Sequence, residues 1–131
     1  TITKGDVFDF SEAKPIGQDI DKDDERLVIA AGYDHTVLLP EHDGLYTFAQ
    51  AKSEKTGIIM DVATTMPGAQ FYSANFLEGI TGKQGHIYNR RDAFCIETQY
   101  VPNAVNCDKF ASPVLKAGQE THTVTTYTFS K

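Results

Sequence analysis

An antiparallel β-sandwich is the fold class that the sequence predicts, and three observations support it. Short runs with period-two or continuous apolar character recur along the 131 residues, and turn residues bound each run. Long stretches with helical periodicity are absent. The runs follow one another at short spacing, which favours a sandwich or barrel, because a sheet with one apolar face must cover that face. A chain of this length is expected to form one domain over residues 1–131.

The expected strands share apolar or alternating side chains between polar ends. They cover residues 35–39, 45–52, 57–64, 69–73, 93–99 and 122–129. Residues 53–57, SEKTG, are typical of a hairpin loop that ends on a glycine. One short helix is expected near residues 19–26, with its charged side chains facing solvent. Residues 78–85 carry three glycines and predict a long flexible loop, which suits either a ligand-covering segment or a plain connection.

Composition and charge exclude several classes of function. The chain is 40% hydrophobic and 23% charged, which predicts a folded protein rather than a disordered one. Its formal net charge of -6 disfavours nucleic-acid binding, which depends on clustered Lys and Arg. No apolar run approaches the roughly 20 residues that cross a bilayer, and the first residues lack the layout of a signal peptide. Cys95 and Cys107 do not form a disulfide framework, so we expect free thiols in a cytoplasmic protein without nucleic-acid or membrane partners.

Motifs for metals and cofactors are also missing. The acidic run DIDKDDER superficially resembles a calcium loop, but Asp24 stands at the sixth position and Ala30 at the twelfth, where such a loop has Gly and Glu. The four histidines lack zinc-site spacing. No nucleophile elbow, P-loop or dinucleotide fingerprint occurs. We therefore expect neither a metal nor a cofactor.

A carboxylate in an apolar stretch raises the main functional question. In the expected strand 93–99, Glu97 and Gln99 share one face, and Phe94 and Ile96 share the other. If Phe94 and Ile96 enter the core, Glu97 and Gln99 point to whatever the opposite face covers. A buried charge needs a partner, a ligand or a catalytic role. On a face open to solvent, Glu97 would instead be an ordinary surface residue.

Two further polar side chains stand where expected strands begin. Asp34 follows a Gly-Tyr turn, and Gln70 follows a Pro-Gly turn between apolar neighbours. Carboxylates and amides bind clustered hydroxyls, and aromatic faces such as those of Tyr33 and Phe71 suit the C–H side of a pyranose. Asp34, Gln70 and Glu97 therefore predict a sugar pocket.

Several longer stretches carry a family resemblance. GYDHT, TTMPGAQFYSANFLEG, GKQGHIYNRRDAFCIETQYVPNAVN and PVLKAGQETHTVTTYTFS together resemble the C-terminal portion of the aldose 1-epimerases, or galactose mutarotases. The resemblance covers essentially the whole chain and is most specific over residues 94–106. It implies a large β-sandwich of which this chain forms a part. It also implies an enzyme that interconverts the α and β anomers of aldohexoses such as galactose and glucose without a cofactor or metal.

The resemblance also implies roles for single residues. Glu97 would be the general base that takes the anomeric hydroxyl proton, and Asp34 and Gln70 would bind sugar hydroxyls. The family's acid is a histidine from an N-terminal portion that nothing in this chain resembles. The sequence starts at Thr1 without a methionine, so we expect a fragment or processed product that associates with the missing half or with itself. Thr36, Ala74 and Asn103 stand where the family commonly has Asn, Gly and Asp.

Two alternatives stay open. The chain could be a non-catalytic carbohydrate-binding module that keeps Asp34, Gln70 and Glu97 as sugar ligands without proton transfer. It could also be a β-sandwich remnant that acts only as an interaction or regulatory piece. Measurements of sugar binding and of the rate of mutarotation distinguish these three hypotheses.

Overall fold

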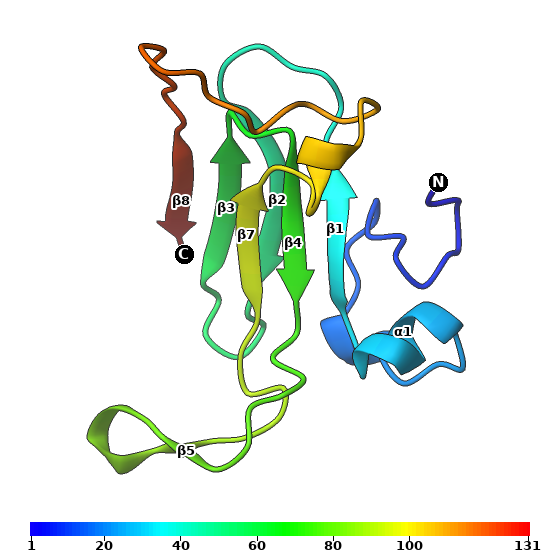
Figure 1. Ribbon diagram of the computed structural model, residues 1–131. Helices are drawn as coiled ribbons and strands as arrows, with labels where there is room; N and C mark the ends of the chain where they lie inside the picture. Colours follow the sequence, from blue (N-terminus) through cyan, green and yellow to red (C-terminus); the bar gives the residue numbers. More distant parts are fainter. The chain divides into compact units, whose positions relative to one another are not determined.

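The computed structural model describes residues 1–131, and strands make up most of its regular secondary structure (Figure 1). The elements, in chain order, are η1 (Ile16–Gln18), α1 (Glu25–Ala30), β1 (Asp34–Leu38), β2 (Tyr46–Lys52), β3 (Ile59–Thr64), β4 (Gly68–Tyr72), β5 (Ile80–Thr81), η2 (Lys83–Gly85), β6 (Ile87–Tyr88), β7 (Cys95–Gln99), η3 (Ala104–Asn106) and β8 (Thr125–Ser130). Strands β1, β4 and β7 form one sheet in the order β1-β4-β7, and the second sheet has the order β2-β3-β8. The predicted all-β, mainly antiparallel fold is thereby confirmed.

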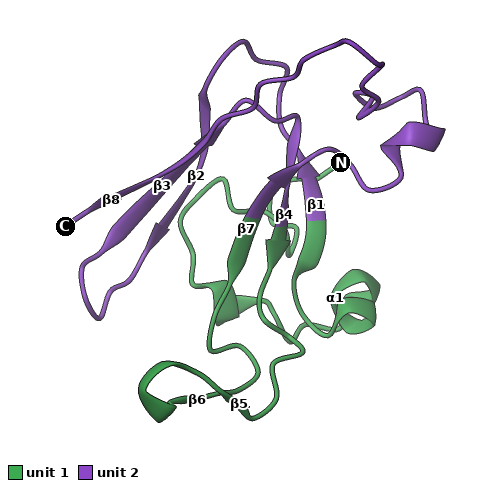
Figure 2. Cartoon of the chain, turned by 60° about the vertical axis from the view of Figure 1, so that its left-hand side comes forward, with its two compact units in different colours: residues 1–35, 71–96 green, residues 36–70, 97–131 purple.

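The chain divides into two compact units (Figure 2). The first unit comprises Thr1–His35 and Phe71–Ile96, and the second comprises Thr36–Gln70 and Glu97–Lys131. Strands β1, β4 and β7 each contribute residues to both units. The expectation of one domain over residues 1–131 stays a prediction.

The six predicted strands are all present, with ends displaced by at most three residues. The predicted hairpin loop joins β2 to β3, where the Ser53 N–H donates to the Ile58 carbonyl and the Gly57 N–H to the Ser53 carbonyl. Gly57 has φ +76°, a conformation that glycine adopts without the clash of a Cβ atom. Alternation and turn chemistry were therefore sufficient to locate these elements.

The second unit buries side chains where two sheets meet. β3 is the middle strand and pairs antiparallel with both β2 and β8. Val62 and Thr64 of β3 are completely buried. The Thr125 hydroxyl of β8 lies 3.1 Å from the Thr64 hydroxyl and 2.6 Å from the Thr98 hydroxyl of β7. Hydroxyl contacts therefore join the β2-β3-β8 sheet to this part of β7.

The first unit has its own apolar core. Ile20, Leu27 and Tyr33 are buried there, and Phe8 and Phe71 pack against them. The Tyr33 ring lies 5.5 Å from Phe8, in an edge-to-face arrangement, and 5.2 Å from Phe71. The Tyr33 hydroxyl donates to the Val7 carbonyl at 2.9 Å, so this buried phenol keeps a hydrogen bond.

The expected helix at residues 19–26 is wrong in position. The observed helix α1 begins at Glu25, because the Asp24 side chain caps it by accepting from the Arg26 N–H. Asp19 was expected on a solvated face, yet it is buried and lies 2.7 Å from both the Lys14 and the Lys22 ammonium groups. Those two ion pairs compensate the cost of burying the Asp19 carboxylate.

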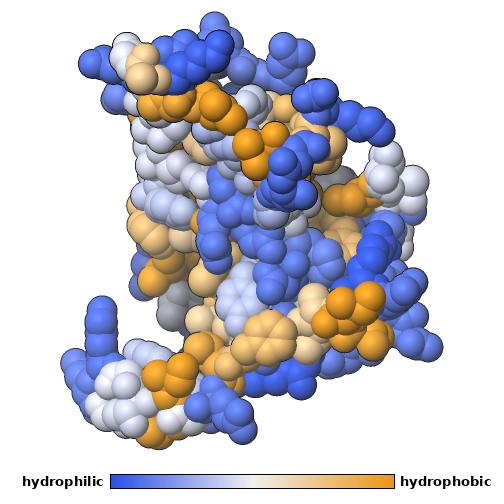
Figure 3. All heavy atoms as spheres, viewed as in Figure 1, coloured by the Kyte–Doolittle hydropathy of each residue, from blue (hydrophilic) through white to orange (hydrophobic).

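The glycine-rich stretch at residues 78–85, expected as a loop, contains strand β5 and the 3-10 turn η2. β5 and β6 form a small antiparallel hairpin, in which Ile80 pairs with Tyr88 and Thr81 with Ile87. Ile80 and Ile87 are about half exposed, and Figure 3 shows hydrophobic atoms on the surface in this part of the unit. No helix in the structure combines the length and the apolar character that a bilayer crossing requires.

Candidate functional site

The three predicted site residues lie on the sheet of β1, β4 and β7. Asp34 is the first residue of β1 and belongs to the first unit. Gln70 lies in β4 and Glu97 in the middle of β7, both in the second unit. Asp34 and Gln70 are half-buried, whereas Glu97 is exposed.

The hydroxyl contact of Thr98 determines which way Glu97 points. The Thr98 side chain meets Thr125 of β8, so this face of β7 is turned toward the second sheet. Successive side chains of a strand point to opposite faces, so Glu97 and Gln99 lie on the other face of β7. Phe94 precedes the strand and is 38% exposed, so it does not enter the core. Ile96 and Thr98 supply the half-buried positions instead.

A chain of hydrogen bonds crosses the sheet on the face that carries Gln99. The Gln99 amide donates from Nε2 to the Thr36 hydroxyl at 3.4 Å, and the Thr36 hydroxyl donates to Oε1 of Gln70 at 2.5 Å. Thr36 lies in β1, Gln70 in β4 and Gln99 in β7, so the network uses all three strands. Figure 3 shows hydrophilic side chains over the middle of β4 and β7 on the face turned to the viewer. The sequence prediction missed Thr36 and Gln99 as members of this cluster.

Gly68 makes room for the network on the central strand. Gly68 and Gln70 share one face of β4 because they are two residues apart. A Cβ atom at position 68 would lie 2.9 Å from the Val37 carbonyl oxygen and 3.7 Å from the Thr36 methyl group. Any larger residue would therefore push against β1 where Thr36 reaches Gln70.

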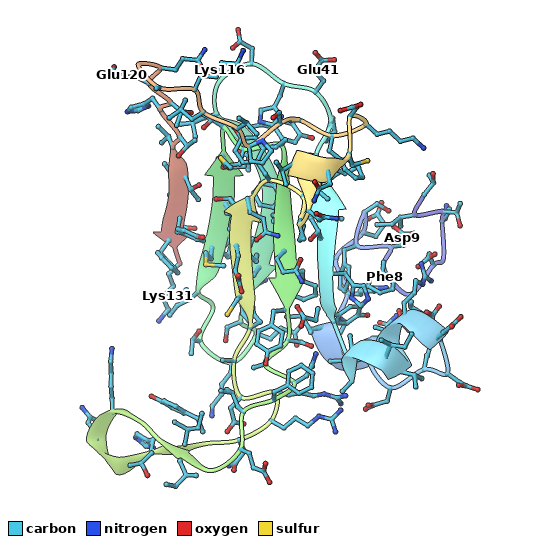
Figure 4. All side chains as sticks on the ribbon, in the orientation of Figure 1. Phe8, Asp9, Glu41, Lys116, Glu120 and Lys131 are labelled. Carbon is cyan, nitrogen blue, oxygen red and sulfur yellow. The ribbon has the colours of Figure 1, made fainter.

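His35 lies next to Asp34 and is half-buried. Its ring packs edge-on against Phe8, with 4.5 Å between ring centroids, and Figure 4 labels Phe8 beside β1. Its Nδ1 accepts from the Asp34 N–H at 3.0 Å. Burial lowers the pKa of His35, against the opposing effect of the Asp34 carboxylate. His35 is thereby held by packing and by the backbone at the start of β1.

A buried amide fixes the entry to β1 within the first unit. Asn75 donates to the carbonyls of Ala30 and Tyr33 at 3.0 and 2.9 Å and accepts from the Ser73 hydroxyl at 2.7 Å. The Ser73 hydroxyl in turn accepts from the Tyr33 N–H at 3.0 Å. Gly32 must be glycine, since a Cβ there would lie 2.3 Å from the Asn75 oxygen. This clamp immediately precedes Asp34, and sequence reasoning did not find it.

The chemistry available on this sheet is that of carboxylates, amides and hydroxyls. An ionised carboxylate accepts protons and hydrogen bonds, and an amide both donates and accepts, which suits a polyhydroxylated ligand. No group of three or more His, Cys, Asp or Glu side chains is arranged to hold a metal ion.

Comparison with known proteins identifies the family. Residues 2–128 match the model of the family described as aldose 1-epimerase. The chain belongs to the aldose 1-epimerase family. It is 40% identical over 100 residues to the galactose mutarotase of Rattus norvegicus, covering 76% of this chain and 29% of the relative.

Further relatives extend the match to nearly the whole chain. The galactose mutarotase of Sus scrofa is 34% identical over 128 residues, covering 97% of this chain and 36% of the relative. The aldose 1-epimerase of Escherichia coli K12 is 33% identical over 128 residues, covering 95% of this chain and 37% of the relative. The chain thus spans about a third of the length of the curated aldose 1-epimerase relatives it matches.

Proposed function

We propose that this chain supplies the general base and part of the sugar site of an aldose 1-epimerase. Glu97 acts as the base, and Asp34 and Gln70 bind hydroxyls of an aldohexose such as galactose or glucose. Membership in the family supports the reaction class. The exposed position of Glu97, on the face of β7 that also carries the Gln99–Thr36–Gln70 network, is the observation on which the assignment rests.

The reaction needs one proton acceptor and one proton donor. Glu97 removes the proton from the C1 hydroxyl, the bond between C1 and the ring oxygen breaks, and C1 becomes an aldehyde carbon. The donor protonates the ring oxygen, so atoms and charge balance. Rotation about the C1–C2 bond and reclosure on the other face of the carbonyl give the second anomer, with the two groups reversing their roles. Positioned proton transfer of this kind contributes about a hundred- to ten-thousand-fold in rate.

The proton donor has to be a group other than Glu97, Asp34 and Gln70. The resemblance to the family implies a histidine from a part of the fold that this chain does not match. We propose that a further segment of the natural protein or a second copy of the chain supplies it. β8 lies at an end of its sheet, where Tyr127 is 46% and Phe129 64% exposed. Edge strands with apolar side chains pair readily with another chain, which supports such an association.

Polarimetry of freshly dissolved α-galactose tests the enzymatic proposal. The natural gene product that contains this sequence should accelerate the approach to anomeric equilibrium, and Glu97→Gln should lower kcat by about a hundredfold or more. Glu54→Gln, an exposed glutamate in the loop between β2 and β3, is the matched control and should leave the rate unchanged.

Other outcomes would contradict the proposal. Full activity of the Glu97→Gln variant would exclude Glu97 as the base. Saturable galactose binding without any acceleration would indicate a carbohydrate-binding module. Absence of sugar binding would indicate an interaction or regulatory piece of the same fold.

A further inference from the structure

We propose that Tyr72 and Phe76 form an aromatic surface that binds the C–H face of a hexopyranose beside Asp34. This inference rests on the proposed function, because it extends the sugar site to which Asp34 is assigned. Tyr33 and Phe71 were the aromatic side chains expected to suit the sugar. Tyr33 is completely buried, and Phe71 packs against it in the core of the first unit, so other rings must supply the aromatic surface.

The pairing of β1 with β4 places Tyr72 directly opposite Asp34. Two backbone hydrogen bonds join the ends of these strands, from the Ser73 N–H to the Tyr33 carbonyl and from the Leu39 N–H to the Pro67 carbonyl. Residue numbers rise along β1 as they fall along β4 in these two pairs, so the strands are antiparallel and residue 34 faces residue 72. Opposite side chains share a face of the sheet, with their Cβ atoms about 5 Å apart. Asp34 and Tyr72 both belong to the first unit.

Phe76 extends the aromatic surface beyond the end of β4. Its ring is nearly parallel to that of Tyr72, with an interplanar angle of 21° and 6.2 Å between ring centroids. Tyr72 is half-buried, whereas Phe76 is 65% exposed. Figure 3 shows hydrophobic atoms on the surface below the end of β4 that Figure 1 marks with its arrowhead. The two rings therefore offer a flat apolar surface next to a carboxylate.

The turn after β4 holds Phe76 in place. The Phe76 N–H donates to the Tyr72 hydroxyl at 3.1 Å, which ties the two aromatic residues together. Asn75, immediately before Phe76, is buried and donates to the carbonyls of Ala30 and Tyr33. An apolar ring kept exposed at a fixed position is unfavourable in water and is typical of a surface that binds a ligand. Because the turn is already ordered, binding requires little further loss of conformational freedom.

A hexopyranose complements this combination of groups. Its hydroxyls lie around the rim of the ring, and its C–H groups give each face apolar character. The negative face of an aromatic ring attracts the slightly positive C–H hydrogens, which an aliphatic side chain does not do. A carboxylate has about four lone-pair sites, so Asp34 can accept from sugar hydroxyls in addition to its contacts within the protein.

Steady-state kinetics on the natural gene product test the aromatic surface. Phe76→Leu keeps an apolar side chain and removes the ring, so KM for galactose should rise about three- to tenfold, with kcat changed less than about twofold. Phe76→Tyr keeps the ring and should leave KM close to that of the parent. Ile29→Ala removes a 77% exposed apolar side chain from α1 of the same unit and should leave both constants unchanged. If Phe76 only packs against another part of the protein, Leu should serve as well as Phe.

Saturation-transfer difference NMR separates this inference from the proposed function, because it needs no turnover. Irradiation of aromatic protons should transfer saturation to the ring C–H protons of galactose in the parent and in Phe76→Tyr, and less in Phe76→Leu. Equal transfer in the parent and Phe76→Leu, or an unchanged KM in Phe76→Leu, would overturn the aromatic surface. Activity of Glu97→Gln equal to the parent would instead overturn the proposed base, and the transfer measurement would still decide the role of Phe76. Absence of any transfer to galactose in the parent would contradict both proposals.

Discussion

Removal of the Asn75 amide should weaken the first unit measurably. Asn75→Ala deletes three hydrogen bonds, to the Ala30 carbonyl, the Tyr33 carbonyl and the Ser73 hydroxyl. Each is worth about 1 kcal/mol net. The Tyr33 carbonyl still accepts from the Ser73 N–H at 3.0 Å, so the loss of its bond from Asn75 costs little. The free energy of unfolding should therefore fall by about 2 kcal/mol in total.

Urea unfolding followed by far-ultraviolet circular dichroism measures this loss. With a slope of about 2 kcal/mol per M for a small domain, the midpoint should fall by about 1 M. Asn89→Ala changes an exposed asparagine and is the control, for which a shift within about 0.5 kcal/mol is expected. Equal midpoints for the two variants would refute the argument that the Asn75 clamp holds the entry to β1.

The variant Asn75→Asp keeps the shape of the side chain and removes the NH2 group that donates to the Ala30 and Tyr33 carbonyls. An ionised carboxylate would face the carbonyls of Ala30 and Tyr33 without a proton to donate, so the loss at neutral pH should exceed that of Asn75→Ala. The pKa of the introduced carboxyl should therefore be raised in the folded state. The variant should be relatively most stable below the unfolded pKa and lose stability as pH rises through the folded value. No dependence on pH beyond that of the parent would contradict this reasoning.

Two further predictions concern β4 and Tyr33. Gly68→Ala places a Cβ 2.9 Å from the Val37 carbonyl oxygen, so the free energy of unfolding should fall by about 1–3 kcal/mol and KM for galactose should rise. Gly17→Ala is the control, because nothing lies within 4 Å of a Cβ at that position. Equal unfolding midpoints for the two variants would contradict the close approach at Gly68. Burial raises the pKa of Tyr33 from 10.0 to about 12, so its contribution to stability should be complete below pH 10 and lost as pH rises through about 12. Absorbance titration of tyrosinate should show a late component that is absent in Tyr33→Phe, and a titration unchanged by this substitution would exclude the assignment.

The strands were predictable because they depend on local signals. Alternation of apolar side chains and turn residues acts over a few positions, and all six predicted strands occur. The start of helix α1 was not predictable in this way, because it depends on which acidic residue of the run 19–24 caps the helix. Asp19 belongs to ion pairs with Lys14 and Lys22, and Asp24 takes the capping position, so an acidic run that looks uniform contains residues with different roles.

The polar network was not predictable by the same reasoning. Thr36, Gln70 and Gln99 come from strands that are distant in sequence, and the order β1-β4-β7 is needed before they become neighbours. Thr36 was noted in the sequence only as a departure from the family pattern. In the structure its hydroxyl is hydrogen-bonded to the side-chain amides of both Gln70 and Gln99. This part of the candidate site therefore depends on the pairing of strands that are distant in sequence, which local sequence patterns do not predict.

The face on which Glu97 lies depends on the register of β7, and one contact explains why it is fixed. Moving the strand by one residue would exchange the faces, turning Glu97 toward β8 and Thr98 outward. In that register a carboxylate would meet the hydroxyls of Thr125 and Thr64, and Thr64 lies where no water reaches it. Burying that charge without a cation would cost several kcal/mol, whereas the observed Thr98–Thr125 contact joins two neutral groups. The neutrality of the threonine cluster therefore selects the register that presents Glu97 on the outer face.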